Sequence, residues 1–351
     1  MKKFVELLPL VVVASLTACE KYKYLDNDYQ PLFAFGTVVS VRMKVQNHFV
    51  GSKTYIGIID TLKAYDRLAD PNRERTGEVS SDYEKGPNVY HLNHTEEKTE
   101  ISWEFYFMLE RAKELQQSVR YFNPLIGSLS NKWKESLGLG EQEHDPAVLS
   151  NDIIQEELEK MRSTSLTTEK EEGAFKHYAQ RVGEGLIDLG AFAKGYALDR
   201  CLDYLEYYTT GDTEDYLINA GNSSILLGEN LQRDNKTFVV GVSENPKIMI
   251  EASNSFISTS GTSEQKAVVN GITYSHIINP EDGSAVSNYD QVTVIAPNVF
   301  GNGALGDALS TSLMMSTLDE IREAETQFGV RVIAIKDGNI VYKSDGVTLY
   351  N

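Results

Sequence analysis

Two stretches of the chain carry side chains that could together bind an anion and a metal ion. The first, residues 187–200, places Asp188, Gly190, Lys194 and Gly195 between a short apolar run and a helical pattern. The amides at the start of a helix attract negative charge, and a lysine beside them adds a full positive charge. The segment therefore suits an anionic ligand, although the same pattern also describes an ordinary strand–turn–helix with a surface lysine.

The second stretch is a helical pattern over residues 303–315 that contains Asp307 and Thr311. Residues four apart lie one above the other on a helix, so this carboxylate and this hydroxyl share a face. Hard oxygen ligands of this kind suit Mg²⁺, which fills its remaining positions with water and phosphate oxygens. The pair alone is a weak signal. It gains weight from His276 near the end of a predicted strand and from an Asn-Pro turn at residues 123–124.

Hydrophobic periodicity predicts that strands and helices alternate along the chain. Predicted helices cover residues 50–68, 103–120, 151–161, 303–315 and 318–328, and another begins near Gly195. Predicted strands cover residues 33–45, 185–189, 215–227, 238–242, 248–252, 256–261, 272–278, 291–296, 330–335 and 340–342, and a small polar loop at residues 219–224 interrupts the third of them. Residues 136–173 are rich in glycine, glutamate and glutamine, which is typical of a variable excursion. The alternation predicts an α/β fold of the mixed α+β kind.

The N-terminus has the pattern of an export signal. Lys2 and Lys3 precede an apolar run over residues 4–16, and Leu16-Thr-Ala-Cys19 follows. A charged start, a short apolar core and small residues describe a secretory signal peptide, and the cysteine in this place resembles that of a bacterial lipobox. We expect residues 1–18 to be removed, Cys19 to be lipidated, residues 19–30 to form a tether and residues 31–351 to form the folded domain. A plain secretory signal with an incidental cysteine is the alternative.

This N-terminus predicts an exported bacterial lipoprotein, anchored to a membrane through its lipid alone, on the periplasmic side or at the cell surface. No other apolar run is long enough to span a bilayer. The formal net charge of −18 disfavours nucleic acid as a partner. With Cys19 lipidated, Cys201 is the remaining thiol, so we expect no intramolecular disulfide.

Beyond these patterns, a series of longer motifs follows in a recognisable order. They are Phe35-Gly-Thr37, Ser81-Asp-Tyr83 with Leu92-Asn93, Phe122-Asn-Pro-Leu-Ile-Gly-Ser-Leu-Ser-Asn-Lys-Trp133, Asp188-Leu-Gly-Ala-Phe-Ala-Lys-Gly-Tyr196, Asn219-Ala-Gly221, Ser258-Thr-Ser-Gly261, Tyr274-Ser-His-Ile-Ile-Asn-Pro280, Val292-Thr-Val-Ile-Ala-Pro297 and Asp307-Ala-Leu-Ser-Thr311. Over nearly all of its mature length the chain resembles the ApbE family of lipoprotein flavin transferases, also described as FAD:protein FMN transferases.

The resemblance implies an ApbE-like fold of two α/β lobes with a cleft for FAD and Mg²⁺ between them. It implies an enzyme that moves FMN from FAD, its substrate, onto a Thr or Ser hydroxyl of an acceptor redox protein in trans and releases AMP. Carried over by position, the FAD contacts would be Phe35, Tyr121, Phe122, Asn123, Asp188, Lys194 and Ile278. The Mg²⁺ ligands would be Asp307, Thr311 and Ala191, the last through its backbone carbonyl. Asp307 and His276 would be catalytic.

Some of these assignments leave alternatives open. His276 would help to deprotonate the acceptor hydroxyl, or it would anchor the end of its strand. Asn123 and Asn279 replace aspartates of the family, Phe35 replaces its methionine, and Gly221-Asn-Ser223 replaces its Gly-Gly-Asp. These departures put flavin affinity in doubt and remove no proposed metal ligand. Two other functions remain: an FAD pyrophosphatase that yields FMN and AMP, and a non-catalytic flavin-binding lipoprotein.

Overall fold

The structure, a computed structural model, describes residues 23–26, 32–45, 48–73, 86–139, 144–209, 215–221, 223–244, 247–263, 265–285 and 287–350. The predicted signal peptide, the predicted lipidation site Cys19 and the motif Ser81–Tyr83 lie outside these residues. Among the described residues, none of the helices is both long enough and apolar enough to traverse a bilayer.

Six of the eight helices in the described ranges follow the sequence periodicity, and the two that cover residues 89–93 and 127–136 were not predicted. The eight helices of these ranges are α1 (His48–Ala69), α2 (Val89–Asn93), α3 (Trp103–Ser118), α4 (Gly127–Ser136), α5 (Asn151–Ser163), α6 (Ala193–Thr209), α7 (Asn302–Leu313) and α8 (Leu318–Phe328). Several have side-chain caps that explain where they begin. Ser102 and Ser150 cap α3 and α5, and Thr317 forms a complete capping box with Glu320 at the start of α8.

The strands form one large sheet and three small ones. The large sheet has the order β1 (Lys23–Asp26), β3 (Thr37–Val45), β7 (Tyr216–Ala220), β8 (Ser224–Leu227), β11 (Ser255–Gly261), β14 (Gln291–Pro297), β15 (Arg331–Lys336) and β16 (Asn339–Lys343), with β2 (Leu32–Ala34) beside β3. The small sheets are β17 (Thr348–Leu349), β10 (Lys247–Ala252) and β9 (Phe238–Glu244); β12 (Lys266–Val269) and β13 (Ile272–Ser275); and β4 (Thr99–Ile101), β6 (Lys176–Val182) and β5 (Ser165–Glu171). The pairings of the large sheet are antiparallel.

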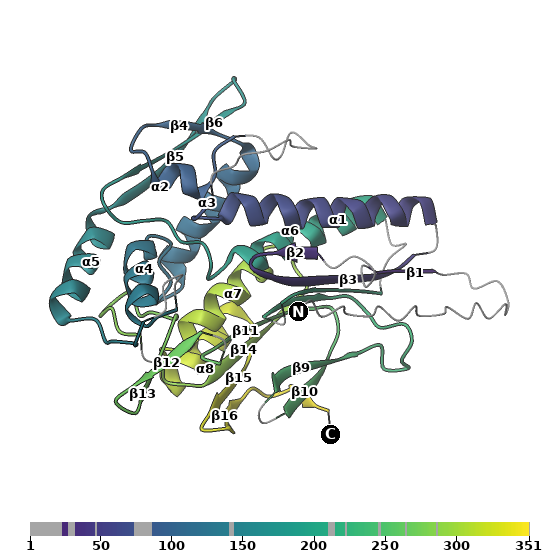
Figure 1. Cartoon of the computed structure of the whole chain (residues 1–351). Helices are drawn as coiled ribbons and strands as arrows, with labels where there is room; N and C mark the ends of the chain where they lie inside the picture. Colours follow the sequence, from purple (N-terminus) through teal and green to yellow (C-terminus); the bar gives the residue numbers. More distant parts are fainter. Residues whose placement is uncertain are drawn as a thin grey trace, which may run out of the picture.

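The large sheet is the middle of three layers. Helices α1, α6 and α7 lie against one face, and the β17–β10–β9 sheet lies against the other (Figure 1). Successive side chains of a strand point to opposite faces. Phe256 of β11 therefore joins the core beneath the helices, whereas its neighbour Ile257 joins the core beneath β9 and β10. The mixed α/β architecture is confirmed, and the division into two lobes stays a prediction.

Several strand predictions were wrong in detail, and two of them concern segments around the site. The apolar run 185–189 is not a strand, because its backbone partners are the first residue of α4 and a side chain. Gly127 donates to the Leu186 carbonyl at 2.9 Å, and the Asn93 side chain exchanges two hydrogen bonds with Ile187 at 2.8 and 2.9 Å. The region 136–173, read as an excursion with one helix, also contributes β5, whose exposed residues conceal the strand pattern.

Candidate active site

A cavity of about 2630 Å³ collects most of the predicted site residues. Every predicted flavin contact lines it, as do His276, Ala191 and Thr311, whereas Asp307 lies just behind its wall. The lining residues come from segments far apart in the chain: Phe35, Tyr121, Phe122, Asn123, Asp188, Ala191, Lys194, His276, Ile278 and Thr311. The structure therefore brings together what the motifs predicted, with one carboxylate set one layer deeper.

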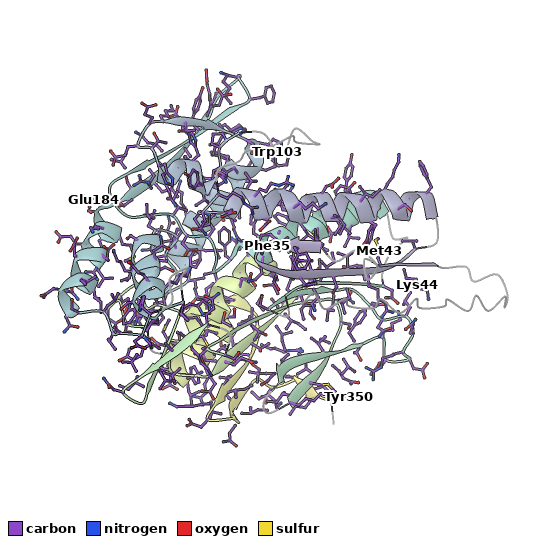
Figure 2. The ribbon with its side chains drawn as sticks, viewed as in Figure 1. Phe35, Met43, Lys44, Trp103, Glu184 and Tyr350 are labelled. Carbon is purple, nitrogen blue, oxygen red and sulfur yellow. The ribbon has the colours of Figure 1, made fainter. Side chains whose placement is uncertain are left out.

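Two aromatic residues of the cavity wall have unusual backbone conformations. Phe35 and Tyr121 have φ angles of 53° and 60°, in the left-handed region that non-glycine residues seldom adopt. Phe35 lies at the turn between β2 and β3 (Figure 2), and its N–H donates to Oδ1 of Asp66 on α1 at 2.5 Å. Burial raises the pKa of Asp66, and the hydrogen bond from Phe35 opposes that rise. Such strain persists where the surroundings hold it, which is typical of ligand-binding positions.

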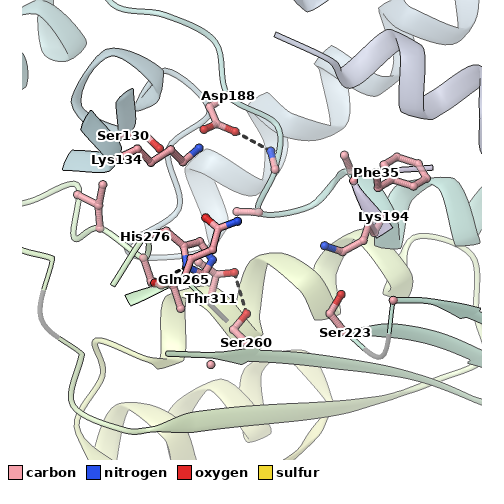
Figure 3. Close-up of a pocket in the computed structure, with 18 of the residues that line it drawn as sticks. Phe35, Ser130, Lys134, Asp188, Lys194, Ser223, Ser260, Gln265, His276 and Thr311 are labelled. Carbon is pink, nitrogen blue, oxygen red and sulfur yellow. Dashed lines mark hydrogen bonds between the residues drawn. The ribbon is translucent and has the colours of Figure 1, made fainter. Parts of the chain in front are cut away.

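The Asn123 turn and the Asp188 segment are joined to each other. Asp188 donates its N–H to the Pro124 carbonyl at 2.8 Å, and Asn123 Oδ1 accepts from the Leu125 N–H at 2.9 Å. The Asp188 carboxylate accepts from the Gly190 N–H at 2.8 Å, a bond drawn in Figure 3. These bonds hold the bend that leads from the extended segment into α6.

Lys194 lies in the first turn of α6 and points into the cavity (Figure 3). Its side chain extends toward the wall that carries Thr311 and Ser223. A lysine ammonium beside a helix N-terminus forms a site for phosphate oxygens. The expectation of an anion site at this turn therefore agrees with the direction of the side chain.

Asp307 is almost completely buried and accepts three hydrogen bonds. Its Oδ1 accepts from the hydroxyls of Ser224 and Ser258 at 2.8 and 2.7 Å, and its Oδ2 accepts from the Gly195 N–H at 2.6 Å. Burial raises the pKa of Asp307, and the positive charge of Lys194 and these three donors act in the opposite direction. A carboxylate has about four acceptor positions, so one position on Oδ2 remains.

The oxygen groups predicted to share this site are of the kinds that a hard divalent cation prefers. Thr311 Oγ1 lies 3.0 Å from Ser260 Oγ, and Thr311 and Ala191 both line the cavity. Among the described residues there is no group of three or more His, Cys, Asp and Glu side chains that could hold a metal by themselves. Mg²⁺ needs no such group, because it is commonly held by one or two carboxylates together with substrate phosphates and water. One carboxylate, one hydroxyl and one carbonyl match that pattern.

His276 lies just beyond the end of β13, where the sequence predicted it to lie within a strand. Its Nδ1 is 3.3 Å from the Gln265 carbonyl, and its backbone N–H donates to the same carbonyl at 3.2 Å. Because a carbonyl only accepts, Nδ1 carries the hydrogen in this bond, and Nε2 is then the basic nitrogen of the neutral ring. This geometry is compatible with both roles considered for His276.

Sequence reasoning missed the side chains that support the site. Asp66 lies 31 residues from the turn it holds, and Ser224, Ser258 and Ser260 hold the acid and the hydroxyl of α7. The serine-rich motif at residues 258–261 was recognised as a motif, but nothing in its composition shows which partner each hydroxyl takes.

These features define an α/β protein with a large cavity in which a lysine at a helix start, an aspartate and a threonine hydroxyl lie close to one wall. A model of the ApbE family matches residues 35–334, so the chain belongs to the ApbE family. An FAD:protein FMN transferase of Vibrio cholerae serotype O1 is 27% identical over 321 residues, covering 87% of this chain and 86% of the relative.

Two solved structures share the fold. The ApbE protein of Thermotoga maritima superposes with a TM-score of 0.69 at 23% identity, covering 92% of this chain and 97% of that one. A histidine-to-glycine mutant of the flavin transferase ApbE from Vibrio cholerae gives a TM-score of 0.66 at 21% identity, covering 94% and 96%.

Proposed function

We propose that the protein is an FAD:protein FMN transferase that uses Mg²⁺ and acts on an acceptor protein. One observation carries the proposal: Lys194 at the start of α6, the Thr311 hydroxyl and the strained turns of Phe35 and Tyr121 line one cavity, with Asp307 directly behind it. This arrangement suits a dinucleotide whose pyrophosphate lies against α6 and α7. The relatives that bear this activity in their names support the same conclusion.

The reaction is a phosphoryl transfer in which positioning and charge neutralisation dominate. An acceptor Ser or Thr oxygen bonds to the FMN phosphorus, the bond from that phosphorus to the bridging oxygen breaks, and AMP leaves with that oxygen. Lys194 neutralises phosphate charge at the start of α6, and His276 is the candidate to take the hydroxyl proton through Nε2. Mg²⁺ held by Asp307, Thr311 and the Ala191 carbonyl would neutralise the pyrophosphate.

The test is to incubate purified protein with FAD, Mg²⁺ and a candidate acceptor. We expect AMP release to match the appearance of a fluorescent flavin-labelled acceptor band, one for one. Rapid AMP release without an acceptor would establish the pyrophosphatase instead. FAD binding with neither product would establish a flavin-binding protein.

We also propose that the protein is an exported lipoprotein tethered through Cys19. The pattern of residues 1–19 supports this, and it would place the catalytic domain beside membrane or exported acceptors. The Cys19→Ser substitution should move the full-length protein from the membrane fraction to the soluble fraction of the bacteria that express it. An unchanged membrane fraction would contradict the lipid anchor.

A further inference from the structure

Helices α6 and α7, which carry the proposed metal site, cap each other's N-terminus. In one direction, the Gly195 N–H near the start of α6 donates to Asp307 Oδ2 on α7 at 2.6 Å. In the other direction, Asp199 on α6 accepts from three amides at the start of α7. They are the N–H groups of Gly301 and Gly303 to Oδ1, at 2.9 and 2.8 Å, and of Ala304 to Oδ2, at 2.8 Å. These are amides that the first turn of a helix leaves without intrahelical partners.

The two halves of this arrangement have the same spacing. Gly195 precedes Asp199 by four residues, and Gly303 precedes Asp307 by four, so each aspartate lies one turn beyond its glycine on the same face. The glycines meet where the helices cross. A Cβ on Gly195 would be 2.0 Å from the Gly303 carbonyl oxygen, and a Cβ on Gly303 would be 2.3 Å from the Gly195 carbonyl oxygen. The two backbones are therefore in direct contact, and neither position has room for a side chain.

Asp199 itself does not line the substrate cavity. It is fully buried, and the three residues that donate to it do not line the cavity either. The N-cap residue of α7, Gly301, has no side chain with which to cap the helix, so Asp199 takes that part from the neighbouring helix. Arg111 of α3 adds a bond to the Gly301 carbonyl at 3.0 Å.

We propose that Asp199 is a positioning residue of the transferase: it fixes the first turn of α7 against α6 and thereby sets the affinity of the Asp307–Thr311 site for its divalent cation. This inference rests on the proposed function. Asp307 follows the capped turn by one helical turn, so a shift of α7 along α6 moves the carboxylate and the Thr311 hydroxyl relative to Lys194. Partners one layer behind metal ligands typically change metal affinity by about 10–100-fold when they are lost.

The decisive variant is Asp199→Asn, which keeps the shape of the side chain. Its NH₂ group must face backbone N–H donors, so at least one bond to α7 is lost. Calorimetric titration of Mg²⁺ into the FAD-loaded protein should show Mg²⁺ binding weakened by about tenfold. At saturating Mg²⁺ the turnover number should stay close to that of the wild type. Leu202→Ala is the matched control, because Leu202 is equally buried on α6 and should lower the melting temperature without changing Mg²⁺ binding.

Two further variants separate the possible failures. Gly303→Ala keeps the Asp199 carboxylate but forces the helices apart, so it should weaken Mg²⁺ binding similarly, and it decides the question if Asp199→Asn does not fold. The positioning role is overturned if the folded variants lose only thermal stability and bind Mg²⁺ normally. If Asp307→Ala also binds Mg²⁺ normally, the metal site of the proposed function fails instead.

Discussion

The α6–α7 pair has a structural end at Asp199 and a cavity end at Asp307. The two ends are built alike, but they face different surroundings. Asp199 and Asp307 are both buried, and each accepts two hydrogen bonds on Oδ1 and one on Oδ2. All three donors of Asp199 are backbone amides, and none of their residues lines the cavity. Two donors of Asp307 are hydroxyls, and its neighbour Lys194 opens onto the cavity. The same hydrogen-bond geometry therefore makes Asp199 a structural cap, whereas Asp307, which lies beside the substrate cavity, is a candidate metal ligand.

The largest loss of activity should come from removing the negative charge of Asp307 at the cavity end. Asp307→Asn keeps the size of the side chain but removes the anionic oxygen proposed to hold Mg²⁺, so the rate of AMP release should fall on the order of a thousandfold. FAD binding, followed by quenching of flavin fluorescence, should persist because the aromatic contacts remain. If Asp199→Asn is as damaging at saturating Mg²⁺, the distinction between a catalytic end and a structural end is wrong.

A smaller loss should follow from Lys194→Met, which keeps the stem of the side chain and removes its charge. We expect kcat/KM for FAD to fall about a hundredfold, since one charged contact to the pyrophosphate disappears. Lys134→Met is the control, because Lys134 of α4 also lines the cavity, away from the α6 start. Equal losses of kcat/KM in the two variants would mean that Lys194 contributes only to the overall charge of the cavity and makes no direct contact with the pyrophosphate.

A still smaller loss, of Mg²⁺ affinity, should follow from removing a serine hydroxyl that donates to Asp307, because Asp199 accepts from backbone amides instead. Ser258→Ala removes one of two donors to Asp307 Oδ1 and should weaken Mg²⁺ binding about tenfold. Ser255→Ala on the same strand is the control, because its hydroxyl donates to the Ser253 carbonyl instead. The Mg²⁺ affinity of both variants can be measured by adding Mg²⁺ to the FAD-loaded protein and following the flavin fluorescence. Identical curves for Ser258→Ala and Ser255→Ala would contradict a role for Ser258 in holding the Asp307 carboxylate.

Much of the fold could be predicted because periodicity is a local property. The patterns of α1, α3, α5, α7 and α8 located each helix to within a few residues. The strand prediction for residues 185–189 failed because an apolar run does not reveal whether its backbone partners are strands or, as here, the Asn93 side chain and the first residue of α4. The sheet β4–β6–β5 was missed because β5 is largely exposed and has little apolar alternation.

The candidate site was predicted from motifs, and the motifs name residues without naming their partners. The predicted flavin contacts share one cavity, as expected. The contact between Asp199 and the start of α7 joins residues 102 to 105 positions apart, and no pattern in either segment shows that they meet. The helical spacing placed Asp307 on the same face as Thr311, but it did not show that α7 is buried nearly all round or that serine hydroxyls bond the acid.

The smallest expected effect is a pH dependence of the free energy of unfolding that arises from Asp199 at the structural end. Burial raises the pKa of Asp199 from 3.8 to about 7, although its three amide donors and Arg111 oppose this. Between these two values the folded protein holds a proton that the unfolded chain has released, so the free energy of unfolding falls as the pH rises toward and through 7. The contribution is fully present below the unfolded pKa, and from pH 6 to pH 7 about 1 kcal/mol of it should be lost. Asp199→Asn cannot titrate, so the stability difference between wild type and variant in urea unfolding should shrink by that amount. A constant difference would mean that the amide donors outweigh burial and that this end of the helix pair keeps its charge throughout.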